Sequence, residues 1–294
     1  MNFLKKNDII DFLSNNIMNQ GLNYEHHTAV FGIKQSIHLI RYNSQINPHL
    51  TLLISKVSEA ILPNTLGNHV GDGDMIDNFL AKQQGVRFII NGGFNHYRKN
   101  FYSWSHQNFN VGDPVGLVKI REHLFEDYID LEHYGFLVQQ EKKAIWQIMQ
   151  KQDLSLKEKY ILGCTPLLIF KGQKLHVPSE LMIPMNDGVI NPPSILGHGL
   201  QHHPRTAVGI KGEELVFLTI EGNSAEYPGC TLPELQDIGM KLGLDSLLNL
   251  DGGGSSQFRL RQNDGAWIQN VVHEEDRARV LGHVLVIFDE TLKG

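Results

Sequence analysis

The sequence predicts a single α+β domain with a mixed, largely antiparallel β-sheet core and flanking helices. Short apolar segments bounded by turn residues recur along the chain, and several other stretches carry helical periodicity. No repeat, low-complexity tract or clear linker divides the 294 residues, and a hydrophobic fraction of 41% is enough for a large core. We therefore expect one compact unit over residues 31–294, preceded by an N-terminal helix and lead-in over residues 1–30.

Helical spacing of apolar residues defines the expected helices. Residues 9–18 place five apolar side chains on one face before Gly21, and residues 74–84 repeat such a pattern before a glycine. A third helix is expected over 231–242, because Thr231 and the glutamate three residues later have the spacing of a capping box. In the charged and poorly periodic middle of the chain, a helix is expected over 141–149.

The expected strands are apolar or alternating runs next to turn residues, and a proline-rich surface loop is expected over 178–204. Lys211–Glu214 has the composition of a hairpin turn between two of these strands. The strands are expected at residues 36–42, 50–55, 86–90, 165–170, 206–210, 215–220, 246–250, 257–260 and 280–288.

Composition and charge exclude several classes of protein. The net charge of -6 and the lack of a Lys/Arg cluster disfavour nucleic acid as a partner. No uncharged apolar stretch approaches the ~20 residues of a membrane-spanning helix, so we expect a soluble protein without a membrane partner. Two distant cysteines indicate neither a disulfide scaffold nor a cysteine zinc site. A cytoplasmic location is expected, or a secreted protein if a leader once preceded this sequence.

The strongest local motif is a glycine-rich turn after an expected strand. Asp251 stands at the strand end and is followed by Gly252, Gly253, Gly254, Ser255 and Ser256. Consecutive glycines let a ligand approach the backbone, and the N–H groups and hydroxyls there are suited to holding an anion. Asp251 itself is a candidate acceptor, base or nucleophile. The alternative is a tight β-turn in which the aspartate is only a local cap.

A second glycine turn follows another expected strand and contains Asn91, Gly92, Gly93, Phe94 and Asn95. Two such strand ends in one domain favour a shared cleft, although a simple hairpin turn is the alternative for this segment.

Further candidate residues lie at other expected strand ends. His203, Arg205 and Thr206 open a strand, where the guanidinium suits phosphate and the imidazole suits proton transfer. Glu221 ends the next strand and offers a second carboxylate. The alternatives are a surface ion pair for the arginine, a solvent-facing loop for the histidine and an exposed turn for the glutamate.

A metal site is not predicted. His198 and His202 have the spacing of helical metal ligands, but surrounding prolines and glycines argue against a helix. Asp72–Asp74 lacks the rest of a calcium-binding loop and is better explained as helix capping. No cofactor is expected, and a divalent cation is left open as the alternative.

Four motifs together resemble one family. They begin at Asn91, His203, Gly229 and Asn249, and read NGGF, HPRTAVG, GCTLPEL and NLDGGGSS. Their order and spacing over about residues 86–288 are similar to those of the phosphodiester glycosidase family. That family includes an enzyme that removes N-acetylglucosamine from a sugar-1-phosphodiester on mannose, and Arg277–Val280 resembles the C-terminal end of the family. Members commonly carry a second phenylalanine where Asn95 stands, and Asp-Gly-Arg where this chain has Glu221–Asn223.

The resemblance implies a glycosidic hydrolase that takes a small-molecule or glycan phosphodiester and cleaves its anomeric C–O bond. Asp251 or Glu221 would face the anomeric carbon, while Arg205, His203 and the glycine-turn N–H groups would hold the phosphate. Asn91 and Asn95 would hydrogen-bond sugar hydroxyls or an acyl amide. Two alternatives stay open: a metal-dependent phosphodiesterase that cuts P–O, and a non-catalytic glycan- or phosphate-binding module. The natural sugar and the oligomeric state are left undecided.

Overall fold

A computed structural model of the chain describes residues 10–13, 21–30, 34–43, 50–54, 75–95, 114–126, 134–139, 145–177, 199–270, 279, 281–289 and 292. These residues contain eighteen strands and two α-helices. Every strand pair among them is antiparallel, so the fold is predominantly β where a more balanced α+β domain was expected. None of the helices in this described part is long and apolar enough to cross a membrane.

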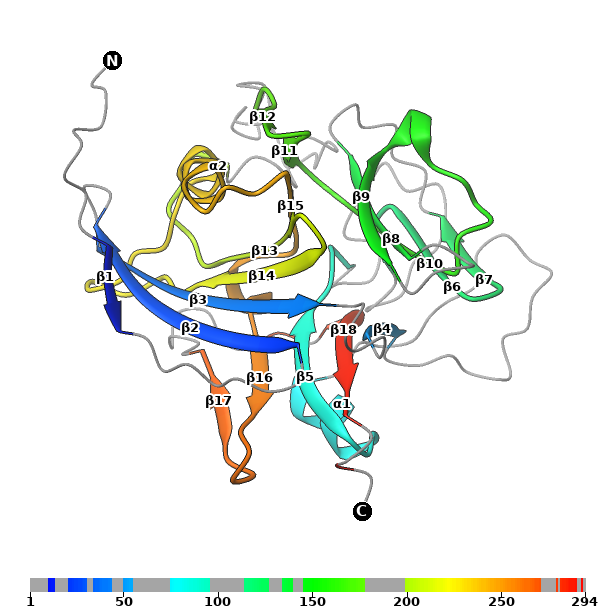
Figure 1. The fold of residues 1–294 in the computed structure, drawn as a ribbon, viewed down its shortest axis with the longest axis horizontal. Helices are drawn as coiled ribbons and strands as arrows, with labels where there is room; N and C mark the ends of the chain where they lie inside the picture. The colour runs from blue at the N-terminus through cyan, green and yellow to red at the C-terminus, as the bar shows by residue number, and fades with distance from the viewer. Residues whose placement is uncertain are drawn as a thin grey trace, which may run out of the picture.

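The largest sheet has eight strands in the order β1-β2-β3-β14-β13-β15-β11-β12 and crosses the middle of Figure 1. In that order the strands span Ile10–Leu13, Leu22–Val30, Lys34–Asn43, Glu214–Ile220, Arg205–Lys211, Ser246–Asn249, Leu167–Phe170 and Gln173–Lys174.

Two five-stranded sheets complete the fold (Figure 1). One has the order β17-β16-β5-β18-β4, with bounds Trp267–Gln269, Phe258–Arg261, Val86–Asn91, His283–Phe288 and Leu50–Ile54. The other has the order β7-β6-β10-β8-β9, with bounds His123–Glu126, Leu117–Ile120, Tyr160–Cys164, Gly135–Gln139 and Trp146–Gln150.

The main core fills the space between the three sheets. Tyr42 and Phe217 of the largest sheet join Phe88 and Phe258 of the second sheet and Leu137 of the third in one buried cluster. Each is at most 1% exposed, and complete burial of such a side chain stabilises the fold by about 1.5–3 kcal/mol. This shared core fixes the position of the three sheets relative to one another.

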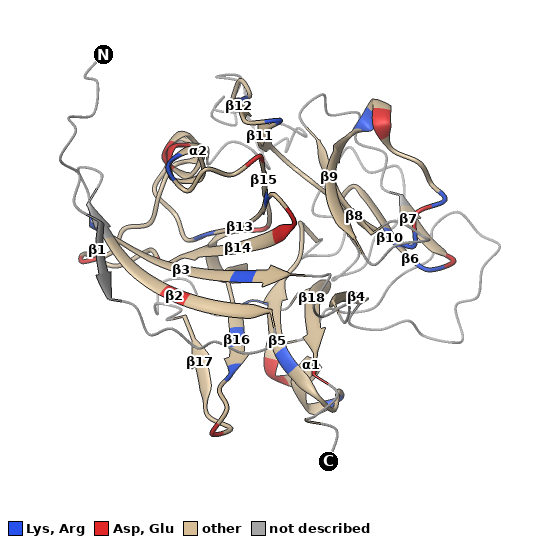
Figure 2. Cartoon of the chain, viewed as in Figure 1, with Lys and Arg blue, Asp and Glu red and all other residues tan. Residues whose placement is uncertain are grey.

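The two helices cover the outer faces of sheets. Helix α2 (Leu232–Lys241) begins at the expected capping box of Thr231 and Glu234 and buries Leu235 and Ile238 against the largest sheet. Helix α1 (Ile76–Ala81) is shorter than the expected 74–84 and packs against β5. Lys, Arg, Asp and Glu are interspersed over turns and strands of the described chain, including β2 and β3 (Figure 2).

Two expected helices are wrong where the structure describes them. Residues 10–13 form β1, because their backbone pairs with β2 and this pairing overrides the helical spacing of the apolar residues. Residues 146–150 form β9, in which Trp146 and Ile148 are buried and alternate with more exposed neighbours, the period of a strand. Residues 14–20 and 141–144 lie outside the described residues.

The expected strands at 36–42, 50–55, 86–90, 206–210, 215–220, 246–250 and 257–260 are confirmed with shifts of a few residues. Those at 165–170 and 280–288 are confirmed as the shorter β11 and β18. Most of the expected loop at 178–204 lies outside the described residues. The division of the chain at residue 30 stays a prediction, and β2 pairs with β3 along its whole length.

Candidate active site

Neighbouring strand ends bring the two candidate carboxyl groups to one edge of the largest sheet. Strand β13 lies between β14 and β15, and its first residue, Arg205, is paired with Ile220, the last residue of β14. On the other side, the Leu250 N–H donates to the Thr206 carbonyl oxygen at 2.9 Å. Glu221 and Asp251 therefore follow strands that flank the start of β13.

Pro204 packs against the residue that follows each carboxyl group. A Cβ atom on Gly222 would lie 2.5 Å from the Pro204 nitrogen, and one on Gly252 would lie 2.9 Å from the Pro204 carbonyl oxygen. These contacts are with backbone, so neither position has room for a side chain. The close approach holds the turns after Glu221 and Asp251 on opposite sides of one residue.

Asn91, at the end of β5, joins the second sheet to this edge. Its Nδ2 donates to the Asp251 carbonyl oxygen at 2.9 Å, and its Oδ1 accepts from the Thr206 hydroxyl at 2.9 Å. The same Oδ1 accepts the Gln257 N–H at 3.2 Å. Asn91 is 1% exposed. Its side-chain amide thus fixes the backbone around Asp251, and the sugar contact expected from sequence stays a prediction.

His283 of β18 anchors the glycine turn after Asn91. The Gly92 N–H donates to its carbonyl oxygen and the Gly93 N–H donates to its Nε2, both at 3.0 Å. Because Nε2 accepts this bond, the ring proton of the neutral imidazole lies on Nδ1. Burial lowers the pKa of His283 to about 4. The histidine is therefore a neutral acceptor that holds the Asn91 turn beside Asp251.

The Asp251 turn is a short 3₁₀ helix over Gly253–Ser255. The Gly253 N–H donates to the Pro204 carbonyl oxygen at 2.9 Å, and the Ser255 N–H donates to the Gly252 carbonyl oxygen at 3.2 Å. These two donors, expected to hold an anion, are engaged within the protein. The Ser256 hydroxyl is buried and has no hydrogen-bond partner among the described residues, which leaves it as a polar group of the site.

Asp251 is partly buried, and this environment changes its acidity. Burial raises the pKa of its carboxyl group to about 6, against the opposing effects of the Ser255 hydrogen bond, the Arg279 charge and the Gly252 N–H. That N–H donates to Oδ1 at 2.9 Å. A carboxyl group with this pKa exchanges its proton near neutral pH, which suits general acid–base chemistry.

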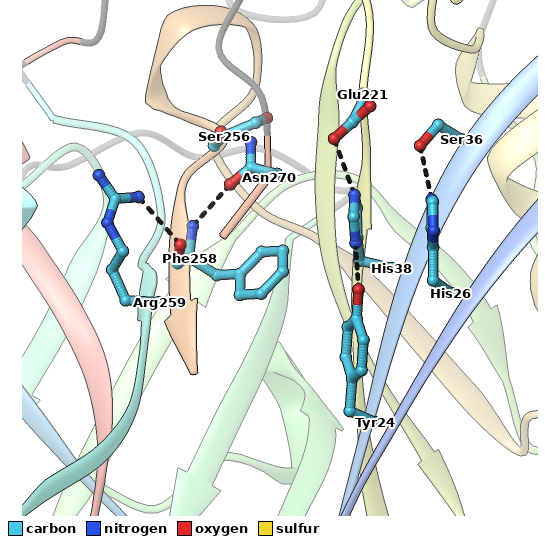
Figure 3. A network of polar contacts seen from close by, with 9 residues as sticks. All are labelled: Tyr24, His26, Ser36, His38, Glu221, Ser256, Phe258, Arg259 and Asn270. Carbon is cyan, nitrogen blue, oxygen red and sulfur yellow. Dashed lines mark hydrogen bonds and ion pairs between the residues drawn. The ribbon is translucent and has the colours of Figure 1, made fainter. Parts of the chain in front are cut away.

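Glu221 is held by side chains from β3 and β2, on the side of β14 away from β13, as Figure 3 shows. Its Oε1 lies 2.8 Å from His38 Nε2, and His38 Nδ1 lies 2.9 Å from the Tyr24 hydroxyl. The three residues are 4–6% exposed. The glutamate is thus a buried member of a hydrogen-bonded series, and the exposed turn considered from sequence is not what the structure shows.

Arg205 and His203 hold the loop that leads into β13. Arg205 is 7% exposed and donates from Nε to the Cys230 carbonyl oxygen and from Nη2 to the Gln201 carbonyl oxygen. Burial lowers the pKa of this guanidinium. The backbone of His203 pairs with Cys230, and its Nε2 lies 3.0 Å from Gln201 Oε1. Arg205 is therefore a buried structural cation beside the Gly252 turn.

The structure does not bring every expected residue into this arrangement. Asn95 is 5% exposed and its backbone bridges to Pro114, beyond the Gly93 end of the turn. Gly254 joins the site from the other direction, because its carbonyl oxygen accepts the Arg279 N–H at 3.1 Å. Among the described residues, no hydrogen bond or ion pair joins Asn95 to Asp251 or Glu221.

Arg279, His283, His38 and Tyr24 were not among the residues singled out from sequence. Arg279 is exposed, and its charge lowers the pKa of Asp251. Its only sequence signal is its place in the Arg277–Val280 segment. His38 is 183 residues from Glu221, so no local motif connects them. In the ranges that the structure describes, no group of three or more His, Cys, Asp or Glu residues is arranged to hold a metal ion.

Glycoside hydrolases typically use a pair of Asp or Glu carboxyl groups, and this antiparallel β scaffold carries two such groups on the strands that flank the start of β13. Comparison with protein families matches residues 84–288 to the phosphodiester glycosidase family. The match covers more than half of the chain, and the protein belongs to this family.

Similar solved structures support the fold. The catalytic domain of zebrafish N-acetylglucosamine-1-phosphodiester alpha-N-acetylglucosaminidase, auto-inhibited by its pro-peptide, superimposes with a TM-score of 0.59 at 16% identity, over 98% of this chain and 86% of that one. A hypothetical protein from Synechocystis gives a TM-score of 0.55 at 13% identity, over 96% and 64% of the two chains. A putative exported protein from Burkholderia pseudomallei gives 0.51 at 13% identity, over 87% and 74%.

One curated relative also shares sequence with the chain. An uncharacterized SPbeta prophage-derived protein of Bacillus subtilis, YomE, is 34% identical over 79 residues. The matched segment covers 26% of this chain and 12% of that protein, so the two share only a small part of the relative's length.

Proposed function

We propose that the protein hydrolyses the anomeric C–O bond of a sugar-1-phosphodiester of the N-acetylglucosamine type, giving free sugar and a phosphomonoester. The observation that carries this proposal is the placement of Glu221 and Asp251 after the two strands that flank the start of β13. Neighbouring strands are about 4.8 Å apart, so the two backbones are separated by about 10 Å. That separation suits a sugar ring bound between the two carboxyl groups.

Asp251 is proposed to activate water. Its pKa of about 6 makes it a stronger base than an ordinary aspartate while it is still ionised at neutral pH. Glu221 is proposed to face the anomeric carbon, as nucleophile or as stabiliser of the oxocarbenium ion. In a retaining reaction Asp251 would activate the water that releases the sugar from Glu221, and in an inverting one the water that attacks C1 directly.

The phosphate is proposed to lie over the Asp251 turn. Arg279 is exposed there, the Ser256 hydroxyl is buried beneath the turn without a partner among the described residues, and buried Arg205 adds positive charge next to Gly252. Negative charge that develops on the leaving phosphate would be stabilised by these groups. Because a phosphomonoester departs readily, the reaction needs little acid assistance. His203 and Asn95 remain proposed contacts of the phosphate and the sugar.

The test is NMR of the methyl phosphodiester of N-acetylglucosamine 1-phosphate, followed by UDP-N-acetylglucosamine, with wild type and Asp251→Asn. Free N-acetylglucosamine from wild type alone supports the proposal, and the anomer that forms first reports retention or inversion. Asp237→Asn on exposed α2 is the matched control and should keep wild-type turnover. N-acetylglucosamine 1-phosphate as the product would mean P–O cleavage and would overturn the mechanism. Binding without turnover would favour a binding module.

A further inference from the structure

The residues around Glu221 that come from β2 and β3 precede residue 84, where the match to the family begins. The register explains how they reach the site. Strand β3 pairs with β14, and the Glu221 N–H donates to the Ser36 carbonyl oxygen at 3.0 Å. His38 lies two residues further along β3, so its side chain is a diagonal neighbour of Glu221 on the same face.

Hydrogen-bond chemistry assigns the protons in this series. A carboxylate only accepts, so His38 Nε2 carries a proton and donates to Glu221 Oε1. In the neutral ring Nδ1 is then an acceptor, and it receives the Tyr24 O–H. Burial and the nearby Glu221 charge raise the pKa of Tyr24, which therefore keeps its proton and acts as a donor.

The surroundings hold the imidazole in this orientation. The His26 ring stacks on His38 with centroids 4.4 Å apart and planes at 6°, and His26 Nε2 is 2.9 Å from the Ser36 hydroxyl. From the second sheet, the Phe258 ring approaches His38 with centroids 5.1 Å apart. Among the described residues, the titratable groups that contact His38 are Glu221, Tyr24 and His26.

We propose that His38 is a positioning residue that presents Glu221 as an oriented carboxylate, and that Tyr24 fixes the imidazole tautomer in which it does so. Without the donor, a buried carboxylate loses a charge-assisted hydrogen bond and its ionised form becomes less favourable. The orientation of Glu221 toward a bound sugar is lost as well. This proposal adds a residue to the site of the proposed function. It rests on that function only for the reactive role of Glu221.

The decisive measurement needs no substrate. Glutamate labelled with ¹³C at the carboxyl group reports the titration of each side chain, and Glu221→Gln assigns the signal of Glu221. In His38→Ala the midpoint of the Glu221 titration should move up by about one pH unit or more, the scale of a lost hydrogen bond to a charge. An unchanged midpoint in a folded variant overturns the proposal. His38→Gln retains an N–H donor, so the midpoint of the Glu221 titration should stay close to that of wild type.

The tautomer is tested with ¹⁵N NMR of the histidine rings, with His38→Gln used for assignment. We expect His38 to carry its proton on Nε2 at neutral pH, and Tyr24→Phe to move the Nδ1 signal toward that of an unbonded acceptor. A proton on Nδ1, or a fully protonated ring, would overturn the role assigned to Tyr24.

If wild type turns over the substrate, kinetics supply a second readout. His38→Ala should lower kcat by about tenfold to a hundredfold, with KM changed much less, and should move the acidic limb of the pH profile upward. His27→Ala is the matched control, because His27 lies on β2 next to His26 but bonds to Glu25. Equal losses in both variants would indicate a general structural effect and overturn the proposal. If wild type has no turnover, the proposed function fails while the two NMR readouts still decide the role of His38.

Discussion

Glu221 and Asp251 follow β14 and β15, the two strands that flank β13, yet two different environments set their chemistry. Glu221 is held by the side chains of His38 and Tyr24, which come from strands near the N-terminus. Asp251 is held by the backbone of its own turn, and burial raises its pKa to about 6. The comparison teaches that donors from distant side chains can favour the ionised form of one carboxyl group while desolvation disfavours that of its neighbour.

The largest expected effect is on turnover. Glu221→Gln and Asp251→Asn should each lower kcat by about 10³-fold, because each removes a carboxylate proposed to act in the transition state. Steady-state release of N-acetylglucosamine measures this loss. If one variant kept wild-type kcat, only the other carboxyl group would act in the chemistry, and the proposal of two reactive carboxyl groups would be wrong.

The next effect concerns His283, which holds the glycine turn on the Asp251 side. Its pKa is about 4 in the folded protein, against 6.5 for an ordinary histidine. Above pH 6.5 both folded and unfolded states are neutral, but as pH falls from 6.5 to 4 only the unfolded state gains the proton. Wild type should therefore lose roughly 3 kcal/mol of stability over that range through this residue.

Urea unfolding of His283→Gln at several pH values tests this expectation, because glutamine can still accept the Gly93 N–H but does not titrate. The loss of stability between pH 6.5 and 4 should be smaller in this variant. Exposed His123 is the control, and His123→Gln should keep the wild-type pH dependence. The same pH dependence in His283→Gln would contradict a neutral, buried histidine.

Removing the charge of each carboxyl group should also have opposite effects on the free energy of unfolding. The folded state binds the Asp251 proton more tightly than the unfolded state does, so the unfavourable term is absent below about pH 4 and complete above about pH 6. Asp251→Asn should gain about 1–3 kcal/mol at pH 7.5 and little at pH 4. Glu221→Gln should instead lose about 1–2 kcal/mol at pH 7.5, because its bond to His38 loses its charge. Denaturant unfolding of both variants at both pH values measures these changes. Stabilisation of both variants at pH 7.5 would contradict the different environments assigned to the two carboxyl groups.

The smallest effect is expected at Thr206, which donates to Asn91 on the Asp251 side. Thr206→Val should cost about 1 kcal/mol, because it leaves the acceptor with one bond fewer at nearly constant volume. Thr219 is directly opposite in the register, and its buried hydroxyl has no partner among the described residues. Thr219→Val should be neutral or stabilising. Equal destabilisation by both changes would show that the bond to Asn91 contributes nothing measurable.

Sequence reasoning succeeded where the signals were local. The Thr231 capping box, the Lys211–Glu214 hairpin turn and the strand before Asp251 are all present, because a few adjacent residues determine each of them. Helical spacing failed at residues 10–13 and 146–150, where pairing with a neighbouring strand decided the backbone conformation. Such pairing depends on a partner elsewhere in the chain and leaves little trace in a short window.

The candidate site shows the same limit. Asp251 and Glu221 were predicted as candidate residues because each follows a strand that the sequence pattern indicates clearly. The roles of their neighbours were not predictable, since Asn91 and Arg205 bond to segments that only the fold brings close. The contact between His38 and Glu221 depends on β3 lying next to β14, which no motif in either strand specifies.

The position of β3 also bears on where this protein can be cut. Strands β1, β2, β3 and β4 all precede residue 84, so a recombinant fragment limited to the family match would lack them. Its β14 would then become an open sheet edge with unpaired N–H and C=O groups, a template for association with other chains. The span over which a sequence resembles its family is therefore shorter than the span that must be expressed together to give a well-behaved molecule.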